Sequence, residues 1–177
     1  MEQKILKLLG VKGTFKKDVI PMINYSSANI TTSGSGYVIS LYFTLFLTGV
    51  VNLKPEQAAI VTFIAGIWDA VIDPFIGIIT DRTRSKYGRH RRYILWAMPL
   101  YAVSFALLWN SYGLDGAARP TQAIIYFTAV YVLYKTAYSF VDVPHVAMLP
   151  ELAPEYNLRT QYNSVGYLFN SAGMVPS

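Results

Sequence analysis

Three long stretches of the chain carry no charged side chain. Residues 19–53, 93–114 and 160–177 contain no Asp, Glu, Lys or Arg. A soluble domain places charges on its surface helices, whereas a helix that crosses a hydrocarbon core of about 30 Å needs about 20 consecutive, mostly apolar residues. The uncharged stretches therefore predict a helical protein that crosses a membrane several times.

We expect an all-α fold with five membrane-spanning helices in one bundle. The predicted spans cover about residues 22–51, 58–80, 93–111, 121–149 and 162–177, and the last one is incomplete at residue 177. The composition agrees with this class, because 53% of the 177 residues are hydrophobic and only 14% are charged. The absence of cysteine excludes a disulfide scaffold and a thiolate metal site.

Basic residues are distributed unevenly between the predicted connections. Residues 1–18 contain five lysines and residues 81–92 contain six lysines and arginines, whereas residues 52–57 and 112–120 contain one basic residue each. Because basic loops mark the cytoplasmic side, we expect a multi-pass protein of the cytoplasmic membrane with its N-terminus inside. The basic clusters adjoin predicted spans, which favours the lipid bilayer over nucleic acid as their partner.

No arrangement of a nucleophile and a base is visible. The two histidines, His90 and His145, lie far apart in the sequence, and no serine stands in a nucleophile elbow. We therefore expect neither an enzyme nor a cofactor.

Four ionisable residues remain at membrane depth once the spans are drawn. They are Asp69, Asp73, Lys135 and Asp142. A charge near the bilayer centre costs about 3 kcal/mol even on lenient insertion scales, so such residues usually face a cavity and mark a pathway. These four side chains carry the functional hypothesis.

The two aspartates of the second span form a candidate cation site. Asp69 and Asp73 are four residues apart, which places both carboxylates on one helix face. Pro74 has no N–H, so the Ala70 carbonyl between them loses its helical partner. Carboxylate and carbonyl oxygens suit Na⁺, and a close carboxylate pair can instead trade protons. The alternative is that the aspartates pair with arginines of other helices as structural locks.

The fourth span carries a second polar stripe. Lys135 and Asp142 are two helical turns apart, with Ser139 and nearly Tyr138 on the same stripe. Since this separation is too long for a direct ion pair, we expect Lys135 to reach an acid on another helix, with the second-span pair as candidates. Asp142 is then left to accept ligand hydroxyls. The alternative is an internal ion-pair network.

The first span has a polar half that is unsuited to lipid. Residues 24–36 are rich in hydroxyls and amides, which line a wet cavity or join helices. Trp68, Tyr25 and Tyr138 are candidates for stacking on a sugar ring, although aromatic residues in membrane helices more often serve packing.

Two sequence segments resemble a known transporter family. Residues 68–89 read WDAVIDPFIGIITDRTRSKYGR, and residues 138–144 read YSFVDVP, followed by Leu149-Pro150. Both closely resemble the glycoside–pentoside–hexuronide:cation symporters, the melibiose-permease-like branch of the major facilitator superfamily. Five residues also look like a stretched form of the loop signature of that superfamily: Gly77, Asp81, Arg82, Gly88 and Arg89. Arg84 lies in the same loop and is a further candidate for gating.

The resemblance implies residue roles. Asp69 and Asp73 would be the cation carboxylates, with Ser139 in the place of a hydroxyl ligand, and Asp142 would bind sugar hydroxyls. The loop after the second span would be a cytoplasmic gate.

The chain also departs from the family pattern. Ser33 falls near the position where melibiose-type members carry a sugar-binding aspartate, and the arginine expected early in the fifth span is replaced around Gly166. Arg92 stands where a proline is usual, and Lys135 is an additional intramembrane cation. This sequence therefore matches the family's cation site more closely than it matches the family's sugar site.

The predicted function is symport of a sugar or glycoside with Na⁺ or H⁺ by alternating access. The chain is expected to be the N-terminal half of a major facilitator transporter, with its C-terminal half supplied in the same chain or by a partner. One alternative is a sodium-coupled transporter of a non-sugar solute such as a lysolipid. Another is a non-transporting sensor or assembly partner built on the half-bundle.

Overall fold

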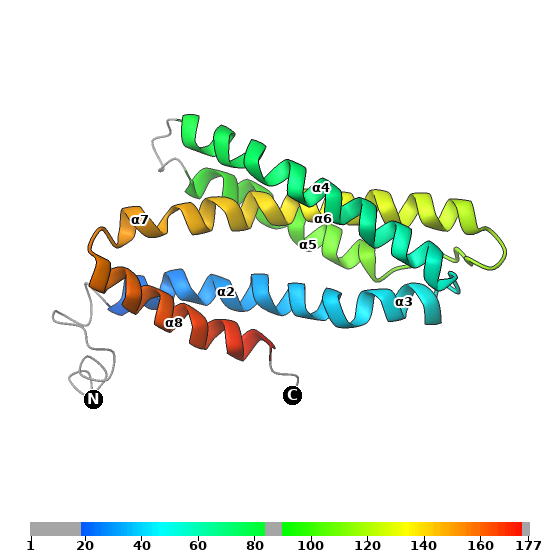
Figure 1. Ribbon diagram of the computed structural model, residues 1–177, viewed down its shortest axis with the longest axis horizontal. Coiled ribbons are helices and arrows are strands. Elements are labelled where there is room, and N and C mark those ends of the chain that lie inside the picture. Colours follow the sequence, from blue (N-terminus) through cyan, green and yellow to red (C-terminus); the bar gives the residue numbers. More distant parts are fainter. Residues whose placement is uncertain (1–18, 84–89, 175–177) are drawn as a thin grey trace. The chain divides into compact units, whose positions relative to one another are not determined.

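The computed structural model describes residues 19–83 and 90–174, and these residues contain helices and no β-strand. The all-α prediction is therefore confirmed. The elements are α2 (Ile20–Val38), the π-helical turn η2 (Ile39–Phe43), α3 (Thr44–Gly49), α4 (Pro55–Arg82), α5 (Arg91–Leu108), α6 (Pro120–Ala147), α7 (Leu149–Leu152) and α8 (Tyr156–Met174) (Figure 1).

Three helical segments are long and apolar enough to cross a membrane. They are Ile20–Gly49, Pro55–Arg82 and Pro120–Leu152. Helix α5 begins with two arginines, and α8 carries polar side chains along its length, so neither belongs to this group. A membrane crossing by α5 and α8 stays a prediction.

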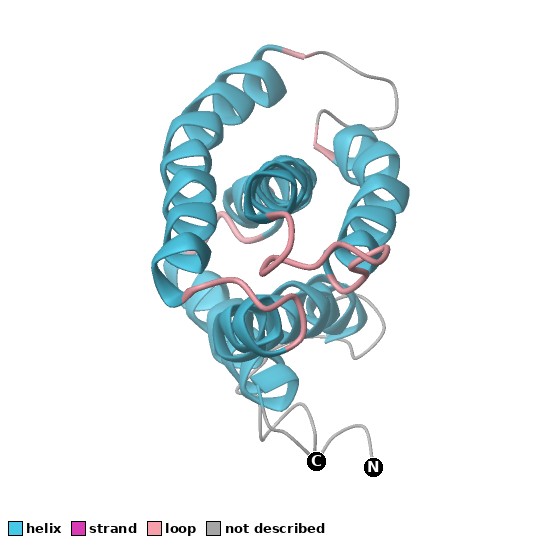
Figure 2. Ribbon diagram, turned by 90° about the vertical axis from the view of Figure 1, so that its right-hand side faces the viewer, coloured by secondary structure: helices cyan, strands magenta, loops and turns pink. Residues whose placement is uncertain are grey.

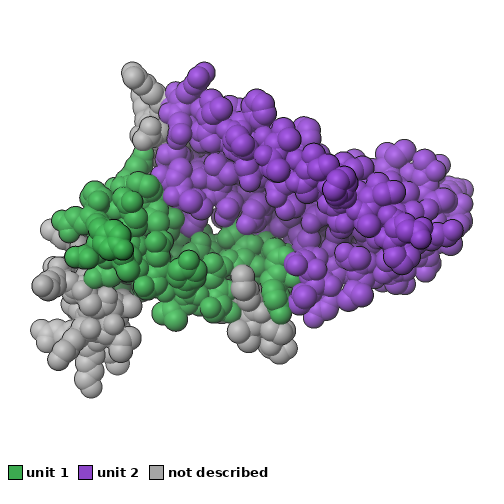
Figure 3. Space-filling view, viewed as in Figure 1, with its two compact units in different colours: residues 1–38, 148–177 green, residues 39–147 purple. Residues whose placement is uncertain are grey.

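Contacts divide the chain into two compact units (Figure 3). Unit 1 comprises residues 1–38 and 148–177, and unit 2 comprises residues 39–147. One boundary falls where α2 gives way to η2, and the other falls between α6 and α7. Four predicted intramembrane charges, those of Asp69, Asp73, Lys135 and Asp142, belong to unit 2.

Within unit 2, α6 packs along both α4 and α5 and lies between them (Figure 2). On α4 the fully buried residues Ala58, Val61 and Ala65 recur at helical spacing, and their small side chains permit close packing against a neighbouring helix. The same spacing continues through Asp69 and Asp73. Packing of α4 therefore places both aspartates, which are partly buried, in line with this stripe rather than on the exposed apolar face of the helix.

The connections at one end of unit 2 are joined by backbone contacts. The Gly116 N–H donates to the Val51 carbonyl over 2.6 Å, and the Asn52 side chain donates to Asp115 over 3.3 Å. A Cβ at Gly116 would lie 2.8 Å from the Val51 oxygen and 2.8 Å from Leu53 Cδ2. Glycine is required here because the two segments leave no room for a side chain.

Unit 1 is held together by α2 and α8, which pack side by side. Its buried apolar cluster contains Met22, Ala153, Tyr162 and Val165. The Tyr25 ring meets the Tyr162 ring edge to face, with 5.7 Å between the centroids. This cluster anchors the first turns of α2 within unit 1.

Candidate functional site

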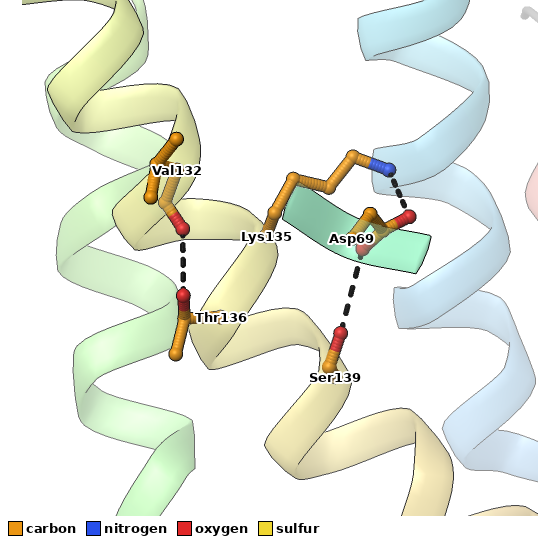
Figure 4. Close-up of polar contacts among 5 residues, drawn as sticks. All are labelled: Asp69, Val132, Lys135, Thr136 and Ser139. Carbon is orange, nitrogen blue, oxygen red and sulfur yellow. Dashed lines mark hydrogen bonds and ion pairs between the residues drawn. The ribbon is translucent and has the colours of Figure 1, made fainter. Parts of the chain in front are cut away.

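The centre of the candidate site is an ion pair between α4 and α6. Lys135 Nζ lies 2.8 Å from Asp69 Oδ2 (Figure 4), and the two side chains are 22% and 26% exposed. The sequence predicted that Lys135 reaches an acid on another helix, and this contact confirms it. The structure adds which of the two aspartates is the partner.

The second oxygen of the Asp69 carboxylate also faces α6. Ser139 Oγ, on a buried residue one turn after Lys135, lies 3.4 Å from Asp69 Oδ1 in a long hydrogen bond (Figure 4). Helix α6 thus supplies a partner for each Asp69 oxygen, one of them charged.

Asp73 lies one turn further along α4 and is differently placed. Within the described part of the chain, its Oδ1 is buried and has no hydrogen-bond partner. A buried carboxylate oxygen without a donor is unfavourable unless it holds a proton or a cation. Pro74 leaves the Ala70 carbonyl without its helical donor one turn before. The chemistry available at Asp73 therefore fits a proton or a monovalent cation.

Two tyrosine rings lie near the Lys135 ammonium. Nζ is 5.9 Å from the centroid of Tyr131 and 6.0 Å from that of Tyr138. These residues stand four before and three after Lys135, so all three share one face of α6. Cation–π attraction stabilises the ammonium where it meets Asp69.

A hydrogen bond absent from the sequence predictions joins α4 and α6 beside the ion pair. Trp68 Nε1 donates to Thr136 Oγ1 over 2.8 Å, and Thr136 Oγ1 in turn donates to the Val132 carbonyl over 2.8 Å. Figure 4 shows Thr136 on the same helix as Lys135. Because Trp68 and Asp69 are adjacent, as are Thr136 and Lys135, the two contacts fix the same crossing. The sequence feature that could have indicated this hydrogen bond is the position of Thr136 directly after an intramembrane lysine.

Asp142 lies one turn beyond Ser139 on α6 and is partly exposed. It interacts electrostatically with His145 on its own helix and with Asp73 and Asp69 on α4. The described residues contain no group of three or more carboxylates and imidazoles arranged to hold one metal ion. Asp142 therefore lies within electrostatic range of the α4 aspartates without forming a three-ligand metal group with them.

The predicted stacking residues have several different environments. Tyr138 packs near Tyr101 and Tyr134, with centroid separations of 6.2 and 6.1 Å, and thus joins a tyrosine cluster between α5 and α6. Trp68 is 41% exposed, and its ring N–H is bonded to Thr136. Tyr25 belongs to the aromatic packing of unit 1. A sugar-stacking role for any of them stays a prediction.

The remaining candidate residues are spread along the chain. Ser33 is partly buried on α2, within unit 1. Gly77 faces α6, where a Cβ would lie 4.0 Å from Val143, and Asp81 and Arg82 are exposed at the end of α4. The other predicted gate residues lie outside the described residues: Arg84, Gly88 and Arg89. The gating hypothesis is therefore untested.

Gly166 marks a close contact inside unit 1. The residue is buried, and a Cβ there would lie 2.9 Å from the Asn29 amide nitrogen. The family resemblance led us to expect an arginine near this position. An arginine at Gly166 would require the Asn29 side chain to shift.

Comparison with known proteins assigns the chain to a family. The model of a family described as MFS/sugar transport protein matches residues 24–176. The matched region contains both segments on which the resemblance was based, as well as every intramembrane charge.

Three similar curated proteins are named as transporters. An uncharacterized symporter of Synechocystis sp. is 30% identical over 86% of this chain, and the isoprimeverose transporter of Lactiplantibacillus pentosus is 26% identical over 89%. Sodium-dependent lysophosphatidylcholine symporter 1 of Xenopus tropicalis is 24% identical over 88%. None of these three is described as an enzyme, in agreement with the sequence-based expectation.

The chain spans only part of these relatives. It covers 28% of the Synechocystis protein, 33% of the isoprimeverose transporter and 29% of the lysophosphatidylcholine symporter. The family match over nearly the whole chain and the three apolar helices agree on an integral membrane protein. The chain belongs to the MFS/sugar transport protein family.

Proposed function

We propose that the chain is the N-terminal part of a symporter that uses a Na⁺ or H⁺ gradient to move a sugar or glycoside by alternating access. The observation that carries this proposal is Asp73, whose buried Oδ1 has no partner among the described residues and lies one turn from the paired Asp69. An intramembrane carboxylate in this state gains stability from a proton or a monovalent cation.

Coupling follows from the charges of α4 and α6. Asp142, the candidate for binding sugar hydroxyls, interacts electrostatically with Asp73. A cation at Asp73 removes a like charge from the surroundings of Asp142, which favours the ionised carboxylate that accepts hydrogen bonds from a neutral solute. By thermodynamic linkage, a bound solute strengthens cation binding to the same extent.

The coupling role of Asp73 is tested by uptake of radiolabelled glycosides into membrane vesicles. Asp73→Asn is expected to abolish accumulation driven by a Na⁺ or H⁺ gradient. Glu56→Gln is the matched control, because Glu56 is an exposed carboxylate in the first turn of the same helix. Gradient-driven accumulation at the unsubstituted level in Asp73→Asn would refute the proposal.

The solute role of Asp142 is tested separately by equilibrium binding of the glycoside that is taken up. Asp142→Ala is expected to lose solute binding while cation binding is retained, since Asp73 remains. Undiminished solute binding in Asp142→Ala would remove this residue from the solute site.

We further propose that the protein lies in the cytoplasmic membrane with its N-terminus inside and that a second helical half completes the pathway. These 177 residues contain no cysteine, so a cysteine introduced among them is the labelling site within this part of the protein. A membrane-impermeant maleimide added to cells should label Lys54→Cys and should not label Lys7→Cys. The reverse pattern would contradict this orientation.

A lysolipid is the second candidate solute. The support is the similarity to a lysophosphatidylcholine symporter together with an apolar depression along α4, lined by Ile60, Phe63 and Ile67, which suits an acyl chain. Proteoliposome uptake of labelled lysophosphatidylcholine, measured beside a panel of glycosides, decides between the two. Na⁺-dependent uptake of the lysolipid alone would replace the sugar hypothesis.

A further inference from the structure

The α4 carboxylates and Lys135 carry an unequal number of charges. Asp69 and Asp73 contribute two negative charges and Lys135 contributes one positive charge. When all three are ionised, the group has one uncompensated negative charge. A single monovalent cation neutralises this group of three. Asp142 on α6 is not counted in the group, because it is assigned to the solute.

The positive charge of Lys135 is assigned to one carboxylate. Its Nζ contacts Asp69 Oδ2 at 2.8 Å, and the other Asp69 oxygen faces Ser139 at 3.4 Å. Asp73 Oδ1, in contrast, is buried without a partner in the described part of the chain. The uncompensated charge therefore resides at Asp73.

The position of the ammonium is stabilised by more than its ion pair. The rings of Tyr131 and Tyr138 lie within 6.0 Å of Nζ. The hydrogen bond from Trp68 to Thr136 holds the two helices together next to it. Both sets of contacts favour an ammonium that stays at Asp69 when a small ion enters.

We propose that Lys135 is a tethered cation that occupies Asp69, so that the coupling ion binds at Asp73 and the aspartate pair accepts one monovalent ion at a time. The proposal rests on the cation coupling proposed above. It differs from a purely structural lock, because it makes the charge of residue 135 a determinant of ion affinity and of ion number.

The first test is equilibrium binding of radioactive Na⁺ to the purified full-length protein. Lys135→Met should raise the apparent Na⁺ affinity at least about tenfold, because both carboxylates become available to one ion. Lys135→Arg keeps the charge and should stay within about threefold of the unsubstituted protein. Lys54→Met is the matched control, since it removes an exposed positive charge at the start of α4.

The double variant Asp69→Asn/Lys135→Met separates charge from architecture. It removes the ion pair but restores the single uncompensated charge at Asp73, so its Na⁺ affinity should return to within about threefold of the unsubstituted value. A structural lock predicts instead that losing both partners leaves the ion site impaired.

A second measurement works for either coupling ion, and its first comparison uses the unsubstituted protein. Dicyclohexylcarbodiimide labels carboxyl groups that hold a proton in apolar surroundings, and mass spectrometry assigns the labelled residue. Asp73 should be labelled several-fold more than Asp69 in the unsubstituted protein, since Asp69 is ion-paired. Lys135→Met should bring the labelling of Asp69 to the level of Asp73.

The outcomes distinguish the inference from the proposed function. Na⁺ affinity that is equal in the unsubstituted protein and Lys135→Met, or equal labelling of Asp69 and Asp73 in the unsubstituted protein, overturns the inference and leaves the symporter proposal standing. Uptake that ignores Na⁺ and H⁺ gradients, together with absent Na⁺ binding and absent labelling in every variant, overturns both.

Discussion

The ion pair between Asp69 and Lys135 should contribute measurably to the stability of the contact between α4 and α6. Two unit charges about 4 Å apart attract by about 4 kcal/mol at an effective dielectric constant of about 20. Desolvation opposes this attraction, and both side chains are about a quarter exposed, so water competes for them. We therefore expect a coupling energy of about 2 kcal/mol.

A double-mutant cycle measures this quantity. Asp69→Asn, Lys135→Met and the double variant are unfolded by SDS in mixed micelles, and helix content is followed by far-ultraviolet circular dichroism. Each single variant leaves one unpaired charge, so the double variant should lose about 2 kcal/mol less than the sum of the two single losses. Additive losses would refute the view that the two charges stabilise each other. Lys135→Arg, which keeps the charge, should retain most of the stability.

Two further predictions concern packing. Trp68→Phe and Thr136→Val should each cost about 1 kcal/mol in the same unfolding assay. Their combination should cost less than the sum of the two single losses, because both remove the hydrogen bond from Trp68 to Thr136. Thr136→Val also removes the bond from the threonine hydroxyl to the Val132 carbonyl, so it should cost at least as much as Trp68→Phe. Additive losses would count against the bond between Trp68 and Thr136. Gly116→Ala should cost about 1–3 kcal/mol because its Cβ would lie 2.8 Å from the Val51 carbonyl oxygen. Gly36→Ala, in open space within α2, should instead be neutral or stabilising by up to about 1 kcal/mol, and an equal loss in both glycine variants would contradict the steric argument.

The helical class of the chain was predictable from its uncharged stretches, because membrane thickness alone sets how long such a stretch must be. Each predicted span contains a helix of the structure, with shifted ends. Helix α8 begins at Tyr156, six residues before the predicted start at residue 162. The predicted start is late because a membrane span is recognised by its hydropathy, and polar residues such as Asn157 and Arg159 lower the hydropathy of the first turns. A helix can nevertheless contain polar turns.

The ion pair was partly predictable. Spacing along α6 excluded a direct contact between Lys135 and Asp142, and it indicated a partner on another helix. Which aspartate of α4 is that partner depends on the rotation and axial offset of two packed helices, and the positions of small residues such as Ala65 and Ala137 do not specify these to within one turn. The bond from Trp68 to Thr136 was missed for the same reason.

The two alternatives left open by the sequence, a cation site and a structural lock, apply to different members of the aspartate pair. Among the described residues, the Lys135 ammonium contacts Asp69, whereas the Oδ1 atom of Asp73, one turn further along α4, has no partner. Asp69 is therefore the locked carboxylate, bound to Lys135 and Ser139. The buried, unpartnered oxygen of Asp73 is the one left for an ion. Under our proposal, the ion pair between Lys135 and Asp69 sets the charge that the ion site accepts. The lysine joins α4 to α6 and neutralises one carboxylate, so a single negative charge is left for a monovalent ion to neutralise.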